Sequence, residues 1–596
     1  MDVIVTEHVP DAVDAALRTG RARLRVRAGE LSISAHGSHV LVGPLLPADT
    51  GGDAPADDAT GCLECALAWR ADVAPHQVGG PPTDVGLDWS ATVEALVASV
   101  VADGPAAWQR RVLALDRATG TLTPHRFLVH PACIVCSAAW EPPAPLDVTT
   151  PQPARPATLR TRSFDRSALR TWLSDTQFGP VTRVRPRGDQ VLVEVESVVP
   201  GRARREIGRA RGTTYAAAEV GAYLEVLERM LGGYRRPSVP VVVASWQEVA
   251  HQAVDPRTLG GHVPELFTRS AQVEPFAPRT TTSWVWGRST REDRPVLVPE
   301  HVAFCQERGV GARFLHETTA ACAIGATREE AVLHALLRTV ERDAFLLAWY
   351  SQARLVEIAP QAGSALDHGR RLLARHGARL RVLDLTTDFG VPVALAVATS
   401  DDEQAVRSGR VPAVTYACSA AADPANAVRG AVRRCTTTVL AHSRGVGEHE
   451  RSGRPRLYDD FDRVCSDQDR TELHASWEAR RLGAFLEHPA AVVAETEHAA
   501  LPGLPGRDVA HALGVLLERT HGLGMDAIVI DQSQPELVEA VGLHVVKVLV
   551  PGTVPRTEGH ALRRTVGLPR LAAGATILRG ARTWTDDPRP NPVPHP

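Results

Sequence analysis

The sequence predicts an α/β domain preceded by a small α+β module that binds zinc through four cysteines. Three observations support this prediction. Two CxxC pairs lie in the first 136 residues, a proline-rich segment follows them, and helical and strand patterns then alternate to the end of the chain. We therefore expect a zinc-binding module at 1–138, a linker at 139–165 and an α/β domain at 166–596.

Composition excludes several classes of protein. The 596 residues carry a formal net charge of −3, so no global basic field indicates a nucleic-acid partner. The sequence has no uninterrupted apolar run of the length that a membrane span needs, and its start lacks the basic and apolar regions of a secretory signal. We expect a cytoplasmic protein with no nucleic-acid or membrane partner.

The chain contains a single lysine, Lys547. A GxxxxGK[ST] phosphate-binding loop is therefore excluded. If the protein binds nucleotide phosphates, it must do so through arginine, a metal ion or backbone amides.

The N-terminal part contains the predicted metal site. Residues 1–46 are expected to form short strands and turns, and the apolar stretch 92–101 is expected to form a helix. Each CxxC turn directs two thiolates at one ion, and two such turns complete the tetrahedral set that zinc prefers. Because four thiolates leave no position for water, the zinc is expected to be structural, with these ligands: Cys62, Cys65, Cys133 and Cys136.

The segment EPPAPLDVTTPQPARP has six prolines in sixteen residues. Proline supplies no backbone donor and breaks helices, so this segment can be neither a helix nor a central strand. The composition predicts a semi-rigid linker.

Three helices are predicted in the larger domain, at 213–233, 327–350 and 423–443. Thr327 can cap the second helix with Glu330 three residues on, and Asp423 can cap the third with Pro424 at its first position. Buried strands are predicted at 295–304, 379–386, 392–399, 526–533 and 544–552.

The segments LVGPLLP, GCLECALAWR, VLALDRATG and HPACIVC resemble the C-terminal half of the ThiF-like module found in thiazole/oxazole-modified microcin proteins. No GxGxxG follows a strand, so this part is not expected to adenylate a substrate. The resemblance implies a separate ThiF-like partner protein that binds the leader of a precursor peptide.

The rest of the chain resembles the YcaO family. The resemblance is carried by AEVGAYLEVLERMLGG, by TTAACAIGATREEAVLHALLRTVERDAF, by VLDLTTDFGVPVALAV with the helix after it, and by DAIVIDQS, GLHVVKVLVPG and the ending NPVPHP. Such enzymes use ATP to phosphorylate a backbone amide oxygen after a Cys, Ser or Thr side chain has attacked the amide carbon. Loss of phosphate then leaves a thiazoline or oxazoline ring in a ribosomally made peptide.

The resemblance also implies roles for particular residues. Glutamates would hold Mg²⁺ through oxygen ligands, arginines would contact the ATP phosphates, and the terminal prolines would order the catalytic pocket. The residues implied for ATP and Mg²⁺ are Arg211, Glu225, Glu228, Arg229, Glu330, Glu341 and Arg342. The residues implied for catalysis are Pro592, Pro594 and Pro596.

Several positions depart from the family pattern: Gly221, Ala320, Ala321, Arg338, Gly430, Arg434 and Thr437. Arg338 and Arg434 place guanidinium groups where carboxylates are expected. Two main hypotheses therefore stay open: a cyclodehydratase, or a catalytically degenerate protein that binds precursor or supports an active partner. Thioamidation and macroamidine formation are lesser alternatives, and the oligomeric state is left open, with a homodimer as one alternative.

Overall fold

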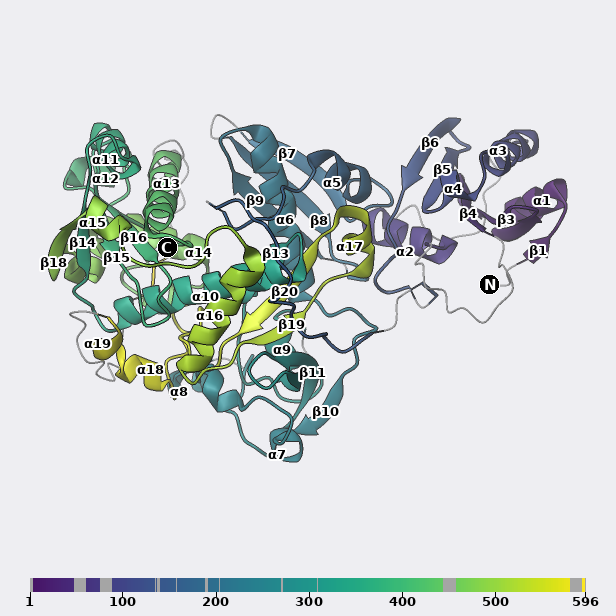
Figure 1. Cartoon of the computed structure of the whole chain (residues 1–596). Coiled ribbons are helices and arrows are strands. Elements are labelled where there is room, and N and C mark those ends of the chain that lie inside the picture. Colours follow the sequence, from purple (N-terminus) through teal and green to yellow (C-terminus); the bar gives the residue numbers. More distant parts are fainter. Residues whose placement is uncertain are drawn as a thin grey trace.

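Figure 1 shows the computed structural model of the chain. The structure describes all residues except 1–3, 48–60, 76–87, 134, 137–139, 157, 188–190, 203, 270–271, 308, 443–456, 579–591 and 595–596, and it leaves out the side chains of 4–6 and 575–576.

The N-terminal module is built on one six-stranded sheet whose strands follow one another in chain order. All neighbouring strands are antiparallel except the first two. The strands are β1 (Ile4–Thr6), β2 (Arg21–Val26), β3 (Gly29–His36), β4 (His39–Pro47), β5 (Arg111–Asp116) and β6 (Thr121–Arg126). The helices are α1 (Val9–Thr19), α2 (Leu63–Val73), α3 (Ser90–Asp103) and α4 (Pro105–Trp108).

The expectation of only short strands and turns in residues 1–46 is wrong at α1. This helix begins with a proline in its first turn and ends at Gly20, which has a left-handed φ of 96°. Ala12, Val13 and Ala16 repeat at helical spacing and are buried against the sheet. This helical spacing of apolar residues is visible in the sequence, but the alternating strand pattern of the neighbouring residues obscured it.

A three-stranded antiparallel sheet opens the larger domain. It consists of β7 (Val181–Arg187), β8 (Leu192–Val198) and β9 (Arg205–Arg211), and it packs against α5 (Arg166–Leu173) and α6 (Tyr215–Gly233). Thr214 caps α6 by accepting a hydrogen bond from the amide of Ala217. A Cβ on Gly221 would lie 2.8 Å from the Cβ of Ala210, so glycine allows α6 to lie close to β9.

Two further sheets complete the domain (Figure 1). One has the order β10-β11-β19-β20-β13, with β12 also paired to β11. Its strands are β10 (Val242–Ser245), β11 (Thr281–Ser289), β12 (Arg294–Pro299), β13 (Cys322–Gly325), β19 (Ile528–Asp531) and β20 (His544–Leu549). The other has the order β17-β16-β15-β14-β18, with β14 (Val356–Ala359), β15 (Arg379–Asp384), β16 (Val393–Thr399), β17 (Val414–Ala420) and β18 (Ala491–Ala494).

Helices surround both sheets. They are α7 (Trp246–Val249), α8 (Pro264–Arg269), α9 (Glu300–Ala303), α10 (Arg328–Tyr350), α11 (Ala365–Arg375), α12 (Glu403–Arg407), α13 (Pro424–His442), α14 (Asp467–Ala475), α15 (Glu495–Ala499), α16 (Val509–Gly522), α17 (Pro535–Val541), α18 (Pro569–Ala572) and α19 (Gly574–Ile577). The three predicted long helices are confirmed, as α6, α10 and α13, and each predicted strand run overlaps an observed strand. The strand prediction for 295–304 is wrong in its second half, where the chain forms α9.

Helix α10 runs through the middle of the larger domain and supplies much of its hydrophobic core (Figure 1). Thr327 caps it as predicted, by accepting a hydrogen bond from the amide of Glu330. The Glu330 carboxylate accepts a hydrogen bond from the amide of Ala326. It therefore does not return a hydrogen bond to the backbone of Thr327, as a full capping box would require. Further along the helix, the buried Asp343 carboxylate accepts from Arg570 at 2.7 Å and from the amide of Val554 at 2.9 Å.

The two parts of the chain are joined by polar contacts. Asp72 accepts a hydrogen bond from the amide of Gly201 at 2.7 Å, and Arg110 donates to Glu539 at 3.2 Å. The guanidinium of Arg110 also lies over the Trp172 ring. These contacts fix the N-terminal module on the three-stranded sheet and α17. In the part of the chain that the structure describes, no helix has the length and apolar character that a membrane crossing requires.

Candidate active site

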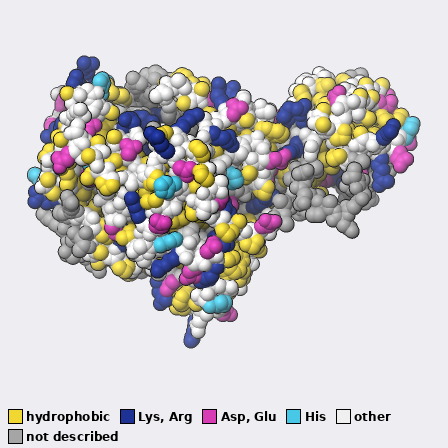
Figure 2. Space-filling model, in the orientation of Figure 1, with side chains coloured by type: hydrophobic (Ala, Val, Ile, Leu, Met, Phe, Trp, Pro, Cys, Tyr) yellow, Lys and Arg dark blue, Asp and Glu magenta, His cyan; other side chains and the backbone are white. Residues whose placement is uncertain are grey.

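Helices α6 and α10 bring most of the predicted ATP and magnesium residues together, and α13 adds one of the substituted arginines. Helix α6 contributes Glu225, Glu228 and Arg229, helix α10 contributes residues 338–342, and helix α13 contributes Arg434. In Figure 1, α6 and α13 both rise from the same side of α10. Figure 2 shows dark blue side chains gathered on the face between these two helices. The positive charge there comes from arginine, because the single lysine is fully buried and its Nζ donates to the carbonyls of Val302 and Thr318.

The Arg338 guanidinium pairs with a predicted magnesium ligand. Its Nη1 lies 2.5 Å from Oε1 of Glu228, and the same nitrogen donates to the carbonyl of Cys322 at the start of β13. Although burial opposes the charge, the Glu228 carboxylate raises the pKa of Arg338. The arginine is therefore held as a cation at the junction of α6, α10 and β13.

The second substituted arginine forms an equivalent pair. Arg434 Nη1 donates to Oε1 of Glu341 at 2.9 Å and to the carbonyl of Cys418 at 2.5 Å. The other oxygen of Glu341 accepts from the amide of Ala420 at 2.8 Å. This pair joins α10 and α13 at the end of β17.

The remaining glutamate of α6 is also paired. Glu225 Oε1 accepts from Arg229 at 2.6 Å, and Oε2 accepts from the amide of Arg209 at 3.0 Å. Burial raises the pKa of Glu225, and the Arg229 charge opposes that shift.

Glu330 is fully buried at the first turn of α10. Arg160 donates to it at 2.8 Å, and the amide and hydroxyl of Thr161 donate to its second oxygen at 2.9 and 2.7 Å. Arg160 and Thr161 belong to the segment that follows the proline-rich stretch. The Glu330 carboxylate therefore joins this segment to α10, and sequence reasoning missed both of its partners because they lie 169 and 170 residues away.

Taken together, these four glutamates have eight carboxylate oxygens. Both oxygens of Glu225, Glu330 and Glu341 accept a hydrogen bond or ion pair, as does Oε1 of Glu228. Oε2 of Glu228 is the one oxygen of this set without a donor in the described structure.

Arg342 differs from its neighbours. Its Nη1 is buried and has no hydrogen-bond partner among the described residues. Burial, with help from the Arg556 and Arg338 charges, lowers the pKa of Arg342 to about 9. A buried unpaired donor is costly, so this position suits an anion. Arg211, at the end of β9, is also desolvated, and burial lowers its pKa.

The glycine at position 430 has a packing reason. A Cβ there would lie 2.2 Å from the hydroxyl oxygen of Ser419, so α13 could not lie this close to β17 with a larger residue. Ala320 lies in a short 3-10 turn, Thr319–Ala321, just before β13. Thr437 is half-buried on α13.

The C-terminal tail reaches the hydrophobic core near the end of α10. Pro592, Val593 and Pro594 are buried, and the carbonyl of Pro592 lies 3.3 Å from Nε2 of His474 on α14. The His474 ring packs on Trp349 near the end of α10. Pro596 lies outside the described residues.

The four cysteines of the CxxC pairs converge. Their sulphur atoms all lie within 4.8 Å of one another, so they could hold a metal ion. The Sγ atom of Cys62 lies 4.0 Å from that of Cys65 and 3.7 Å from that of Cys133. Tetrahedral zinc with Zn–S bonds of about 2.3 Å requires sulphurs about 3.8 Å apart, so this geometry fits zinc. His130 points elsewhere, with Nε2 at 2.9 Å from Asp72.

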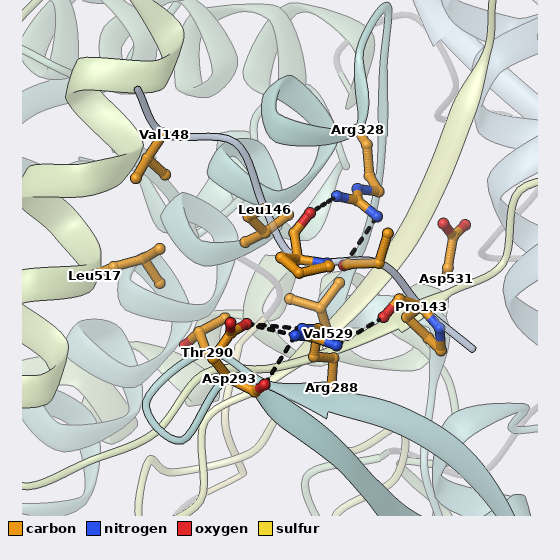
Figure 3. A pocket seen from close by; sticks show the side chains of 12 residues that line it. Pro143, Leu146, Val148, Arg288, Thr290, Asp293, Arg328, Leu517, Val529 and Asp531 are labelled. Carbon is orange, nitrogen blue, oxygen red and sulfur yellow. Dashed lines mark hydrogen bonds and ion pairs between the residues drawn. The ribbon is translucent and has the colours of Figure 1, made fainter. Parts of the chain in front are cut away.

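A cavity of about 190 Å³ lies beneath residues 143–148 of the proline-rich segment (Figure 3). Arg328 Nη1 donates to the carbonyl of Ala144 at 3.0 Å, and Arg288 Nη1 donates to that of Pro143 at 3.2 Å. In the described part of 139–165 the segment contains no helix or named strand. Its backbone is nevertheless held against the larger domain by these two side chains.

Comparisons with known proteins identify the family and the fold. A family model described as YcaO cyclodehydratase, ATP- and Mg²⁺-binding, matches residues 209–554. An uncharacterized protein in the tfuA 3′ region of Rhizobium leguminosarum bv. trifolii is 28% identical over 274 residues, 45% of this chain and 60% of that protein. The chain thus aligns with less than two thirds of this relative.

Two solved structures share the fold over the whole chain. A heterocyclase in complex with substrate and cofactor matches with a TM-score of 0.68 and 18% identity, covering 100% of this chain and 81% of that chain. The heterocyclase TruD matches with a TM-score of 0.64 and 18% identity, covering 100% and 79%. The likeness of the N-terminal module to ThiF-like proteins stays a prediction.

Proposed function

Because the chain belongs to the YcaO cyclodehydratase family, we propose that it is the YcaO component of an ATP-dependent cyclodehydratase acting in the cytoplasm. Its substrate would be a ribosomally made precursor peptide, and its products would be thiazoline or oxazoline rings formed from Cys, Ser or Thr. The observation that carries this proposal is the convergence of Glu225, Glu228, Arg229, Glu341 and Arg342 from two helices at one site.

ATP fits this site through its phosphates. When bound, ATP supplies the phosphoryl group that turns an amide oxygen into a good leaving group. The donor best suited to a phosphate is Nη1 of Arg342, which has no partner among the described residues. Glu225 and Glu341 then act on Arg229 and Arg434, since each carboxylate fixes the direction of one guanidinium.

The tail has a positioning role in this proposal. Pro592 and Pro594 are buried, and the carbonyl of Pro592 contacts His474, which packs on Trp349 near the end of α10. The rigid backbone of proline keeps such a segment extended at low entropic cost. The tail would thereby order the pocket in which the peptide amide reacts.

A separate leader-binding protein is the second part of the proposal. The described residues of 4–126 form a six-stranded sheet with four helices. The four cysteines bring the start of α2 together with the segment that follows β6. We assign structural zinc to these cysteines. A module held in this way suits docking a ThiF-like partner that binds the leader.

A catalytically degenerate protein is the second candidate function. The pairing of Arg338 with Glu228 and of Arg434 with Glu341 favours it, because these carboxylates are no longer free to bind a metal ion. In that case the chain would bind precursor or support an active biosynthetic partner.

The combined variant Glu225→Gln and Glu341→Gln separates the two candidates. If the chain is catalytic, ring formation in the reconstituted pathway should fall by at least about 100-fold, because two arginines lose their orienting charges. Mass spectrometry of the precursor measures the water lost per ring. Glu403→Gln, which breaks an exposed pair with Arg407, is the control and should leave the rate unchanged. Undiminished ring formation by the double variant would establish the degenerate alternative.

Leader binding by the isolated chain should be weak, with a Kd above about 100 μM. Fluorescence polarisation of a labelled synthetic leader peptide measures it, and adding the partner protein should restore tight binding. A Kd below about 1 μM for the chain alone would rule out the proposal that a separate partner protein binds the leader.

The purified chain should contain about one zinc ion, detected by elemental analysis. Cys62→Ser and Cys133→Ser should both lose the metal and lower the melting temperature, since metal binding and folding are linked. Cys465→Ser, at an exposed cysteine outside the cluster, is the matched control. A metal-free preparation that melts at the same temperature as the untreated protein would contradict a structural zinc.

A further inference from the structure

The glutamates expected to hold magnesium are already neutralised by arginine. Glu225, Glu228, Glu330 and Glu341 pair with Arg229, Arg338, Arg160 and Arg434 respectively. A hard divalent cation needs carboxylate or other oxygen ligands. With seven of the eight oxygens engaged and a guanidinium beside every carboxylate, these residues do not fit Mg²⁺.

The two substituted arginines are anchored where they are. Arg338 bonds the carbonyl of Cys322 as well as Glu228, and Arg434 bonds the carbonyl of Cys418 as well as Glu341. Swinging either side chain away to admit a cation would break two contacts at once. It would also leave a carbonyl at a strand end without this donor.

Both arginines nevertheless keep donors for a ligand. In the described structure each uses only Nη1 in its hydrogen bonds, and a guanidinium has five N–H groups. Their side chains are 39% and 49% exposed, so the other donors can reach solvent. Arg342 adds a positive charge whose buried Nη1 has no hydrogen-bond partner among the described residues.

We propose that this pocket binds the triphosphate of the nucleotide without carboxylate-bound Mg²⁺, with Arg338 and Arg434 supplying the hydrogen-bond donors that their glutamates leave unused and Arg342 supplying the uncompensated positive charge. The proposal rests on the proposed function, because it concerns the nucleotide site of the same enzyme. The four glutamate–arginine pairs balance in charge, which leaves Arg342 as the net cation of the set. Arginine suits phosphate because its planar fork can donate two parallel hydrogen bonds.

Isothermal titration of the full chain with adenylyl imidodiphosphate tests the proposal, once in Mg²⁺ and once in excess EDTA. The expected Kd in EDTA is within about threefold of that in Mg²⁺, or tighter, because arginine donors need no metal. Binding that weakens by more than about tenfold in EDTA would overturn the proposal and leave the proposed enzyme standing. Absence of binding in both buffers would overturn it too, and would also count against an ATP-dependent enzyme.

The double variant Arg338→Glu and Arg434→Glu should make nucleotide binding depend on Mg²⁺. It returns two carboxylates to the pocket, so nucleotide binding should become at least about tenfold weaker in EDTA than in Mg²⁺. Arg433→Glu is the matched control, because it makes the same charge change at the exposed neighbouring position of α13 and should behave as the unaltered chain. A double variant that stays indifferent to Mg²⁺ would contradict the role given to these two arginines. If the double variant does not fold, the affinities of the unaltered chain in Mg²⁺ and in EDTA still test the proposal.

Discussion

The ion pair between Arg338 and Glu228 is the interaction on which the site depends. It joins α6 to α10, and its second bond, to the carbonyl of Cys322, holds both helices at the edge strand β13. The positive charge of Arg338 also affects the pKa of a neighbouring residue, His334. Together with burial and the Arg160 charge, it lowers the pKa of His334 well below the usual value. A fixed guanidinium therefore stands where the family pattern has a metal-binding carboxylate, and the neighbouring His334 contacts the carbonyl of Leu159.

The proline-rich segment links the pocket to the N-terminal module through the start of α10. Arg328 bonds carbonyls of the segment, and Glu329 accepts from the amide of Asp147 and from Gln152. Glu330 accepts from Thr161 and Arg160. Three successive residues of one helical turn thus anchor the chain that leads to the cysteine cluster.

The sequence was sufficient for the three long helices of the larger domain, for five of its strands and for the cysteine cluster, because periodicity, caps and CxxC spacing are local signals. Thr327 and Pro424 mark helix starts at the predicted places. Helix α1 was missed among the strands around it, and the partners of Glu330 were missed because tertiary contacts have no local pattern. The glutamates were expected to bind metal, and whether they pair with arginine instead depends on how α6, α10 and α13 cross. Close approaches at Gly221 and Gly430 seat α6 against β9 and α13 against β17.

The central claim is that arginine has replaced metal as the positive charge of this site. Electron paramagnetic resonance with Mn²⁺, titrated into the zinc-loaded chain without nucleotide, tests it most directly, because the signal of free Mn²⁺ falls as the ion binds. The account predicts that the full chain leaves Mn²⁺ free up to millimolar concentration, since each glutamate of the set already has a guanidinium partner. One or two Mn²⁺ ions bound at micromolar concentration, and lost in Glu228→Gln with Glu341→Gln, would contradict it.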